Sequence, residues 1–260
     1  MTDRVSRKYI QEITIKYKNY LKQTPRYERF MDGENISKWI SILGPDVLLL
    51  THGEVTADIA EEFVQYNETK GIKLTKEEKY QLLLVPYIHD WGEIIIEDEG
   101  VGDVTFDDKN DTAEAVEGII FNKVVSSIKD ELIKEKFHIA YQNVVMKRDT
   151  KLGEMFNAIE RIGYLKTAIK AFAGSDDKSR IKNWKGLVGN VLSNQIQKLL
   201  EYSKKYPYVY SFLEEEKENI QSMFDGTINI KVPYDNKDKL SFDAEKLNNA
   251  YDIWKKTFTV

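Results

Sequence analysis

The sequence predicts an all-α protein. Only 5 Pro and 14 Gly occur in 260 residues, so few positions interrupt a helix. Apolar side chains recur every three or four residues through most of the chain, which is the spacing of one face of a helix. Residues 226–233 alternate as a short strand would, but one strand cannot build a sheet.

The same apolar spacing predicts ten helices in chain order. In the first part of the chain we expect them at residues 3–22, 34–42, 53–68, 75–89, 113–130, 131–147 and 150–174. A polar stretch, Ser175-Asp176-Asp177-Lys178-Ser179, follows, and three more helices are expected at residues 181–205, 209–223 and 243–257. This stretch is the predicted boundary between a core, residues 1–175, and a C-terminal, mainly helical extension, residues 176–260.

Composition excludes several classes of protein. The chain has no cysteine, so disulfides and thiolate metal sites are excluded and any metal must bind to N and O ligands. The lack of cysteine also fits a cytoplasmic protein. No apolar run has the length of a membrane-crossing helix, and the first residues lack the apolar core of a signal peptide. A net charge of −5 gives no general attraction to nucleic acid or to an anionic membrane.

Two of the three histidines occupy apolar helical positions. His52 shares its helical phase with Ile59, and His89 ends a hydrophobic stretch, residues 82–88, directly before Asp90. Histidine and aspartate are rarely buried unless they are paired. Each histidine taken alone is more simply a core or helix-end residue. The pair, with a carboxylate beside it, predicts a site for one divalent transition metal such as Mn, Fe, Co or Zn.

These residues follow a known pattern. A histidine opening one helix, His-Asp closing another and a later acidic residue on a long helix resemble the HD-domain metal-dependent phosphohydrolases, whose fold is a helical bundle. His89-Asp90-Trp91-Gly92-Glu93, followed by Gly102-Asp103-Val104, is similar to the His-Asp-x-x-Glu…Gly-Asp-[Ile/Leu/Val] signature of the 5'-deoxynucleotidase branch. Lys38-Trp39 occupies the place of that branch's upstream basic–Trp pair, with Lys for the usual Arg. The link from Glu93 to Gly102 is longer than usual in the family.

The resemblance implies that His52, His89 and Asp90 bind the metal together with a fourth ligand. That ligand is normally an aspartate, and the corresponding helix, residues 153–166, contains none. Glu160 is favoured because an anionic oxygen holds a divalent cation better than an amide does, and because its helix face is the more apolar one. Asn157 stays the alternative.

The resemblance also assigns roles outside the metal ligands. Glu93 would orient or deprotonate the attacking water, and Asp103 would assist it or contact the sugar. Lys38 would contact the phosphate and Trp39 would line the sugar pocket. An exposed Glu93 at the start of an acidic loop, and a core Trp39, are the simpler alternatives. The third histidine, His138, lies among charged residues and is expected to be structural, which leaves a site for a single ion.

The implied activity is metal-dependent hydrolysis of the 5'-phosphate of (deoxy)nucleoside monophosphates. Two alternatives stay open. One is an HD-type nucleoside triphosphate hydrolase that uses the basic residues within 178–185. The other is a non-catalytic nucleotide-binding or assembly module on a degenerate HD scaffold, with the aromatic residues of the extension as a partner surface. We expect a nucleotide as the partner and neither nucleic acid nor a membrane; a homodimer, common among similar proteins, stays open.

Overall fold

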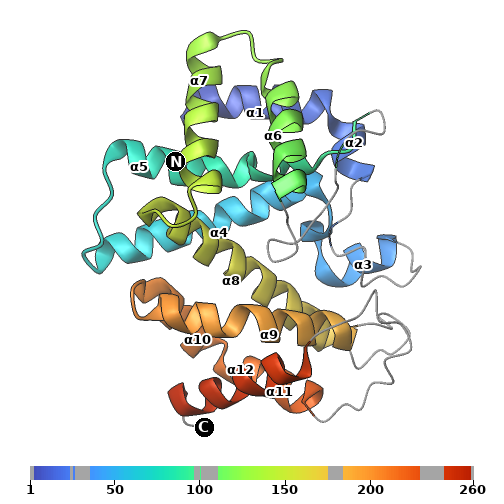
Figure 1. The fold of residues 1–260 in the computed structure, drawn as a ribbon, viewed down its shortest axis with the longest axis vertical. Helices are drawn as coiled ribbons and strands as arrows, with labels where there is room; N and C mark the ends of the chain where they lie inside the picture. Colours follow the sequence, from blue (N-terminus) through green and yellow to red (C-terminus); the bar gives the residue numbers. More distant parts are fainter. Residues whose placement is uncertain are drawn as a thin grey trace. The chain divides into compact units, whose positions relative to one another are not determined.

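The described residues of the computed structural model form twelve α-helices and no strand (Figure 1). The structure describes residues 3–23, 26, 36–96, 100, 111–174, 184–228 and 243–258. The all-α prediction is therefore confirmed. In these parts of the chain, no helix combines the length and the apolar character needed to cross a membrane.

The chain divides into two compact units, and two long helices run from one unit into the other. The first unit consists of Met1–Arg26, Pro45–Val64 and Lys73–Asn157. The second consists of Tyr27–Gly44, Gln65–Ile72 and Ala158–Val260. The shared helices are α4 (Leu49–Thr69) and α8 (Lys151–Ala173). The predicted boundary at 175–179 lies outside the described residues, so the division at residue 175 stays a prediction.

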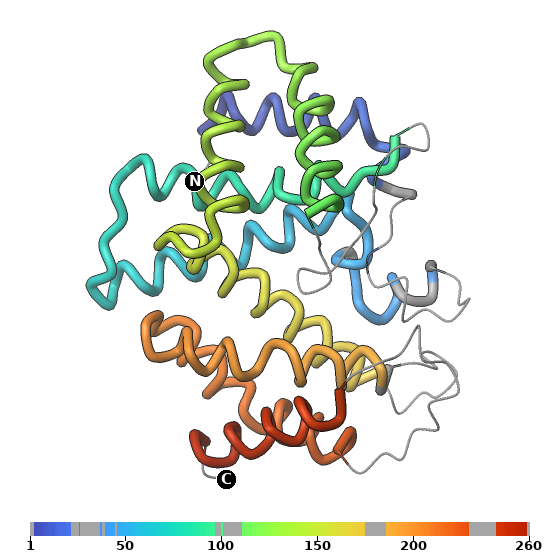
Figure 2. The backbone as a smooth tube through the Cα atoms, viewed as in Figure 1, coloured from blue at the N-terminus to red at the C-terminus, as the bar shows by residue number. Residues whose placement is uncertain are grey.

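Besides its parts of α4 and α8, the first unit contains shorter helical elements, which can be followed along the tube in Figure 2. Its elements are α1 (Arg4–Lys16), α2 (Lys18–Gln23), the 3-10 helix η2 (Pro45–Val47), α5 (Lys76–Leu84), the 3-10 helices η3 (Val85–Tyr87) and η4 (His89–Glu93), α6 (Asp111–Val125), α7 (Glu131–Ala140) and a π-helical turn (Tyr141–Met146). The helix predicted at 3–22 is thus two helices, since Tyr17 ends the first of them.

The prediction of one helix over residues 75–89 is wrong beyond Leu84. Its start is as expected: Thr75 and Glu78 form a reciprocal capping box. Pro86 then brings the α-helix to an end, because proline has no N–H to donate to the preceding turn. Two 3-10 turns replace the last part of the helix, and the second of them begins with His89.

Close packing of α6 holds η4 in place. A Cβ on Gly92 would stand 2.6 Å from the carbonyl oxygen of Glu117 on α6, so this position accepts no side chain. Trp91 beside it is buried and its ring lies 6.0 Å from that of Phe137 on α7. The two residues after Asp90 therefore fix the His-Asp segment against α6 and α7.

The second unit contains α3 (Ile36–Leu43) and four helices from the C-terminal part of the chain. These are α9 (Trp184–Ser203), α10 (Pro207–Glu215), α11 (Lys217–Thr227) and α12 (Ala244–Thr257), with α10, α11 and α12 all packed on α9. The single helix predicted at 209–223 is two, and the strand predicted from residue 226 is wrong at its start, because Gly226 and Thr227 end α11. The rest of that stretch, residues 229–233, lies outside the described residues.

Aromatic residues of the extension mainly fill the core of this unit. Trp254 is fully buried, and its ring centroid lies 4.4 Å from that of Phe258. Tyr202 and Tyr206 are buried as well, whereas Tyr210 is half exposed. Core packing therefore explains Tyr202, Tyr206, Trp254 and Phe258, whereas Tyr208 and Tyr210 keep exposed surface.

Candidate metal centre

His52 lies in the first turn of α4, because the helix begins at Leu49 rather than at residue 53. The next residue, Gly53, lets this turn approach the segment before His89. A Cβ on Gly53 would stand 3.0 Å from Pro86 O and 3.1 Å from Tyr87 Cα. This approach brings the ring centroids of His52 and His89 within 5.1 Å of each other.

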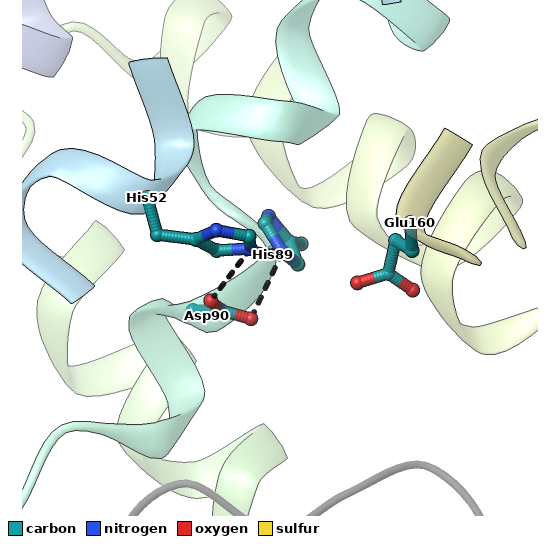
Figure 3. A group of neighbouring side chains, drawn as sticks. All are labelled: His52, His89, Asp90 and Glu160. Carbon is teal, nitrogen blue, oxygen red and sulfur yellow. Dashed lines mark hydrogen bonds and ion pairs between the residues drawn. The ribbon is translucent and has the colours of Figure 1, made fainter. Parts of the chain in front are cut away.

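The coordinating atoms of the two histidines and Asp90 lie close together (Figure 3). His52 Nε2 is 3.2 Å from His89 Nε2, and the two oxygens of Asp90 lie 3.0 Å from His89 Nε2 and 3.5 Å from His52 Nε2. Two ligand atoms that each bind one ion at about 2.1 Å are separated by about 3.0–3.4 Å in octahedral to tetrahedral sites. A single ion can therefore reach all three side chains.

Both histidines use Nδ1 elsewhere. His89 Nδ1 lies 2.9 Å from the carbonyl oxygen of Pro86, and His52 Nδ1 lies 2.6 Å from Asp46 Oδ1. These oxygens only accept, so a ring that donates to them from Nδ1 alone presents the lone pair of Nε2. Two lone pairs facing each other at 3.2 Å repel, and so would two imidazolium ions. A shared cation relieves the repulsion.

Asp90 adds a negative charge to this arrangement. Burial works against ionisation of Asp90, but the positive charge that His89 and His52 carry when protonated, a hydrogen bond from His89 and the charge of Arg26 hold the pKa of its carboxyl well below its usual range. Its Oδ2 is buried and, among the described residues, accepts no hydrogen bond. A buried carboxylate oxygen without a donor is costly, and a metal ion is a suitable partner for it.

The fourth predicted ligand, Glu160, is carried by α8. Phe156, in the part of α8 that belongs to the first unit, packs edge-on against His89 with ring centroids 5.1 Å apart. Glu160 lies one turn further along the same helix, and Figure 3 shows its carboxylate turned toward His89. One ligand atom from each of four residues lies within 4.8 Å of the others: His52, His89, Asp90 and Glu160.

The expectation that Glu160 occupies the more buried face of α8 is wrong. Asn157 is 8% exposed, whereas Glu160 is partly exposed. Asn157 shares its side of the helix with Arg161, which is buried because it donates hydrogen bonds to Asn194 O and Gln195 Oε1 on α9. Glu160 is nevertheless the residue of α8 whose ligand atom lies close to those of the two histidines and Asp90.

Glu93 is buried, with 5% of its surface exposed, so the alternative of an exposed loop residue is wrong. It ends η4, and a 3-10 helix has three residues per turn, so Glu93 follows Asp90 on the same side. It is not one of the four clustered residues. A buried carboxylate one turn from a candidate metal ligand is suited to proton transfer rather than to metal binding.

Three other predicted residues are not placed. Asp103 lies outside the described residues, as do the side chains of Lys38 and Trp39, although the backbone of both belongs to α3. His138 is partly exposed and lies edge-on to Phe121 on α6, away from the clustered group, in agreement with a structural role.

Two residues of the site were not predicted from the sequence: Asp46 and Arg26. Asp46, on η2, accepts from the Nδ1–H of His52, and Arg26 Nη1 lies 3.1 Å from Asp46 Oδ1. All three side chains are buried. Asp46 follows Gly44-Pro45, an ordinary turn sequence, so nothing in the local pattern distinguishes it from a solvated turn residue.

Comparisons with known proteins found no match among protein-family models, curated proteins or solved structures. The chemistry of the site is therefore read from its own residues. Two imidazoles and two carboxylates form an all-N/O ligand set, which suits a divalent transition metal. The residues present fit such an ion, and they do not distinguish among Mn, Fe, Co and Zn.

Proposed function

We propose that this protein is a metal-dependent phosphohydrolase that removes the 5'-phosphate of (deoxy)nucleoside monophosphates. The observation that carries the proposal is the pair of histidine Nε2 atoms, 3.2 Å apart, beside an aspartate whose Oδ2 is buried. This arrangement supports a metal ion held by four ligands: His52, His89, Asp90 and Glu160. The order of these residues and of Glu93 along the chain matches the HD pattern, which supports the reaction class.

A bound divalent ion would supply Lewis acidity, lowering the pKa of a coordinated water from about 15.7 toward about 7 and neutralising phosphate charge. The protein's own residues would do the rest. Asp46 and the Pro86 carbonyl fix the two imidazole rings. Glu93 would accept a proton from the attacking water and return it to the leaving sugar oxygen.

The experiment is phosphate release from a panel of nucleoside and deoxynucleoside monophosphates by purified protein loaded with Mn²⁺ or Co²⁺. We expect orthophosphate release that is abolished in His89→Gln. The matched control is His138→Gln, which changes the histidine outside the cluster and is expected to keep full activity.

Other outcomes separate the alternatives. Release of pyrophosphate or tripolyphosphate from triphosphates, with monophosphates left intact, would replace the proposed substrate class. Bound metal with no hydrolysis of any nucleotide would leave a metal site without this reaction. Absence of metal after loading with each candidate ion would remove the proposal altogether.

A further inference from the structure

We propose that Asp46 and Arg26 are positioning residues that select the proton arrangement of His52 and so prepare its Nε2 to bind metal. The metal-binding part of this inference rests on the proposed function, whereas the proton arrangement does not. The inference assigns a role to two buried charged residues that the reaction itself does not use.

The first step concerns which atom His52 offers. Histidine carries a proton on one ring nitrogen when neutral, and the partner of the other nitrogen decides which one. Asp46 Oδ1 lies 2.6 Å from His52 Nδ1, and a carboxylate oxygen can only accept. Asp46 therefore holds the proton on Nδ1, which leaves the lone pair of Nε2 directed at His89 and Asp90.

The second step concerns a competing contact. Arg26 Nη1 lies 2.7 Å from the same His52 Nδ1, and a donor there would favour the opposite tautomer. That arrangement would place a bare ring nitrogen 2.6 Å from a carboxylate oxygen, with two lone pairs in contact. Arg26 Nη1 also reaches Asp46 Oδ1 at 3.1 Å and Asp46 O at 3.3 Å, so it donates fully to Asp46 without using the ring.

The third step concerns why Arg26 is needed. Asp46 and Arg26 are 2% and 4% exposed, and a buried charge is costly unless an opposite charge is paired with it. Arg26 pairs with Asp46 and fixes its position, because its guanidinium is always charged and donates to both the side-chain and the backbone oxygen of Asp46.

The fourth step is the consequence of removing Asp46. His52 Nδ1 would lose its carboxylate acceptor, and the proton would move to Nε2, where the Thr56 hydroxyl lies 3.2 Å away and Asp90 Oδ2 3.5 Å away as acceptors. The ring would then hydrogen-bond to one of these acceptors at the nitrogen that a metal needs. Partners of this kind behind a metal-binding histidine typically contribute about 10–100-fold in metal affinity.

The experiment records two-bond ¹H–¹⁵N correlation spectra of the metal-free full chain at a pH where the imidazoles are neutral. Only three histidines contribute, and single His→Gln variants assign them. We expect His52 to carry its proton on Nδ1 in the wild type and mainly on Nε2 in Asp46→Leu. His138, which lies outside the cluster, is the internal control and should not change.

Asp46→Leu leaves the charge of Arg26 buried without Asp46 beside it. If this single variant does not fold, the double variant Arg26→Met with Asp46→Leu removes both charges and allows the same measurement. Metal titration of each folded variant should give affinity for Co²⁺ about 10–100-fold below that of the wild type. A wild type with the proton on His52 Nε2, or variants with the wild-type tautomer, would overturn the inference. A wild type with the proton on Nδ1 but no affinity for any metal would overturn the proposed function alone.

Discussion

Gly53 offers a sharp test of how the two histidines are brought together. Replacing it with alanine adds one methyl group at a point where α4 meets backbone atoms of η3. The new Cβ would lie 3.0 Å from Pro86 O and 3.1 Å from Tyr87 Cα, both closer than ordinary carbon contacts. Neither neighbour is a flexible side chain, so α4 and η3 must separate by a few tenths of an ångström.

The magnitude follows from two opposing effects. Overpacking of this kind lowers the free energy of unfolding by about 1–3 kcal/mol. Alanine in place of glycine inside a helix raises it by about 0.5–1 kcal/mol. Gly118 on α6 is the matched control, since a Cβ there meets nothing within 4 Å and only the second effect applies. The helix effect cancels between the two variants, so Gly53→Ala should be about 1–3 kcal/mol less stable than Gly118→Ala.

The assay is urea unfolding of both variants, followed by circular dichroism, and a repeat with Mn²⁺ or Co²⁺ present. Pro86 O also accepts the hydrogen bond of His89 Nδ1, so displacing it should weaken metal-induced stabilisation in Gly53→Ala and leave it unchanged in Gly118→Ala. Equal stability of the two variants would refute the close-approach reasoning. Equal metal-induced stabilisation would show that the separation of the histidines does not depend on Gly53.

Two further predictions concern the fourth ligand and acid stability. Glu160→Gln should lower Co²⁺ affinity by at least about tenfold while Asn157→Ala does not, as measured by competition titration; the reverse order would assign the ligand to Asn157. The Thr75 backbone N–H, followed by Lys151, lowers the pKa of Glu78 below its usual value. Glu78 therefore stabilises the folded protein relative to Glu78→Gln. This stabilisation is fully present above about pH 4.3, the pKa of a free glutamate, and is lost as the pH falls through the lower pKa of Glu78 in the folded protein. Urea midpoints at neutral and at strongly acidic pH measure this, and a gap between the two proteins that persists in acid would contradict it.

Most of the fold could be predicted because helices follow local rules. Apolar spacing and sparse Gly and Pro placed nearly every helix of the described residues within a few positions. The predictions failed where one residue changes the backbone locally, as Pro86 does at the end of α5. They also failed where a continuous apolar pattern concealed a break, as at Tyr17 and at Glu216, because periodicity alone carries no signal for a single helix end.

The candidate ligands His52, His89 and Asp90 could be found because a histidine on an apolar face is unusual in any sequence. Asp46 and Arg26 could not, since an aspartate after Gly-Pro and an isolated arginine are ordinary surface residues by pattern. Their burial depends on contacts between segments 20 residues apart in the chain. The choice of Glu160 rested on charge, and the accompanying argument from helix faces was wrong because α9 buries the side of α8 that carries Arg161.

The sequence by itself determined that the chain is helical, that any metal must bind N and O atoms, and which two histidines are candidates for it. These properties depend on residue type and short-range spacing. Only the tertiary structure decided that the two Nε2 atoms face each other, that Asp46 and Arg26 lie beside His52 Nδ1, and that Glu93 is buried. Such facts depend on how closely separate helices approach, which is set by side-chain volume at positions such as Gly53 and Gly92.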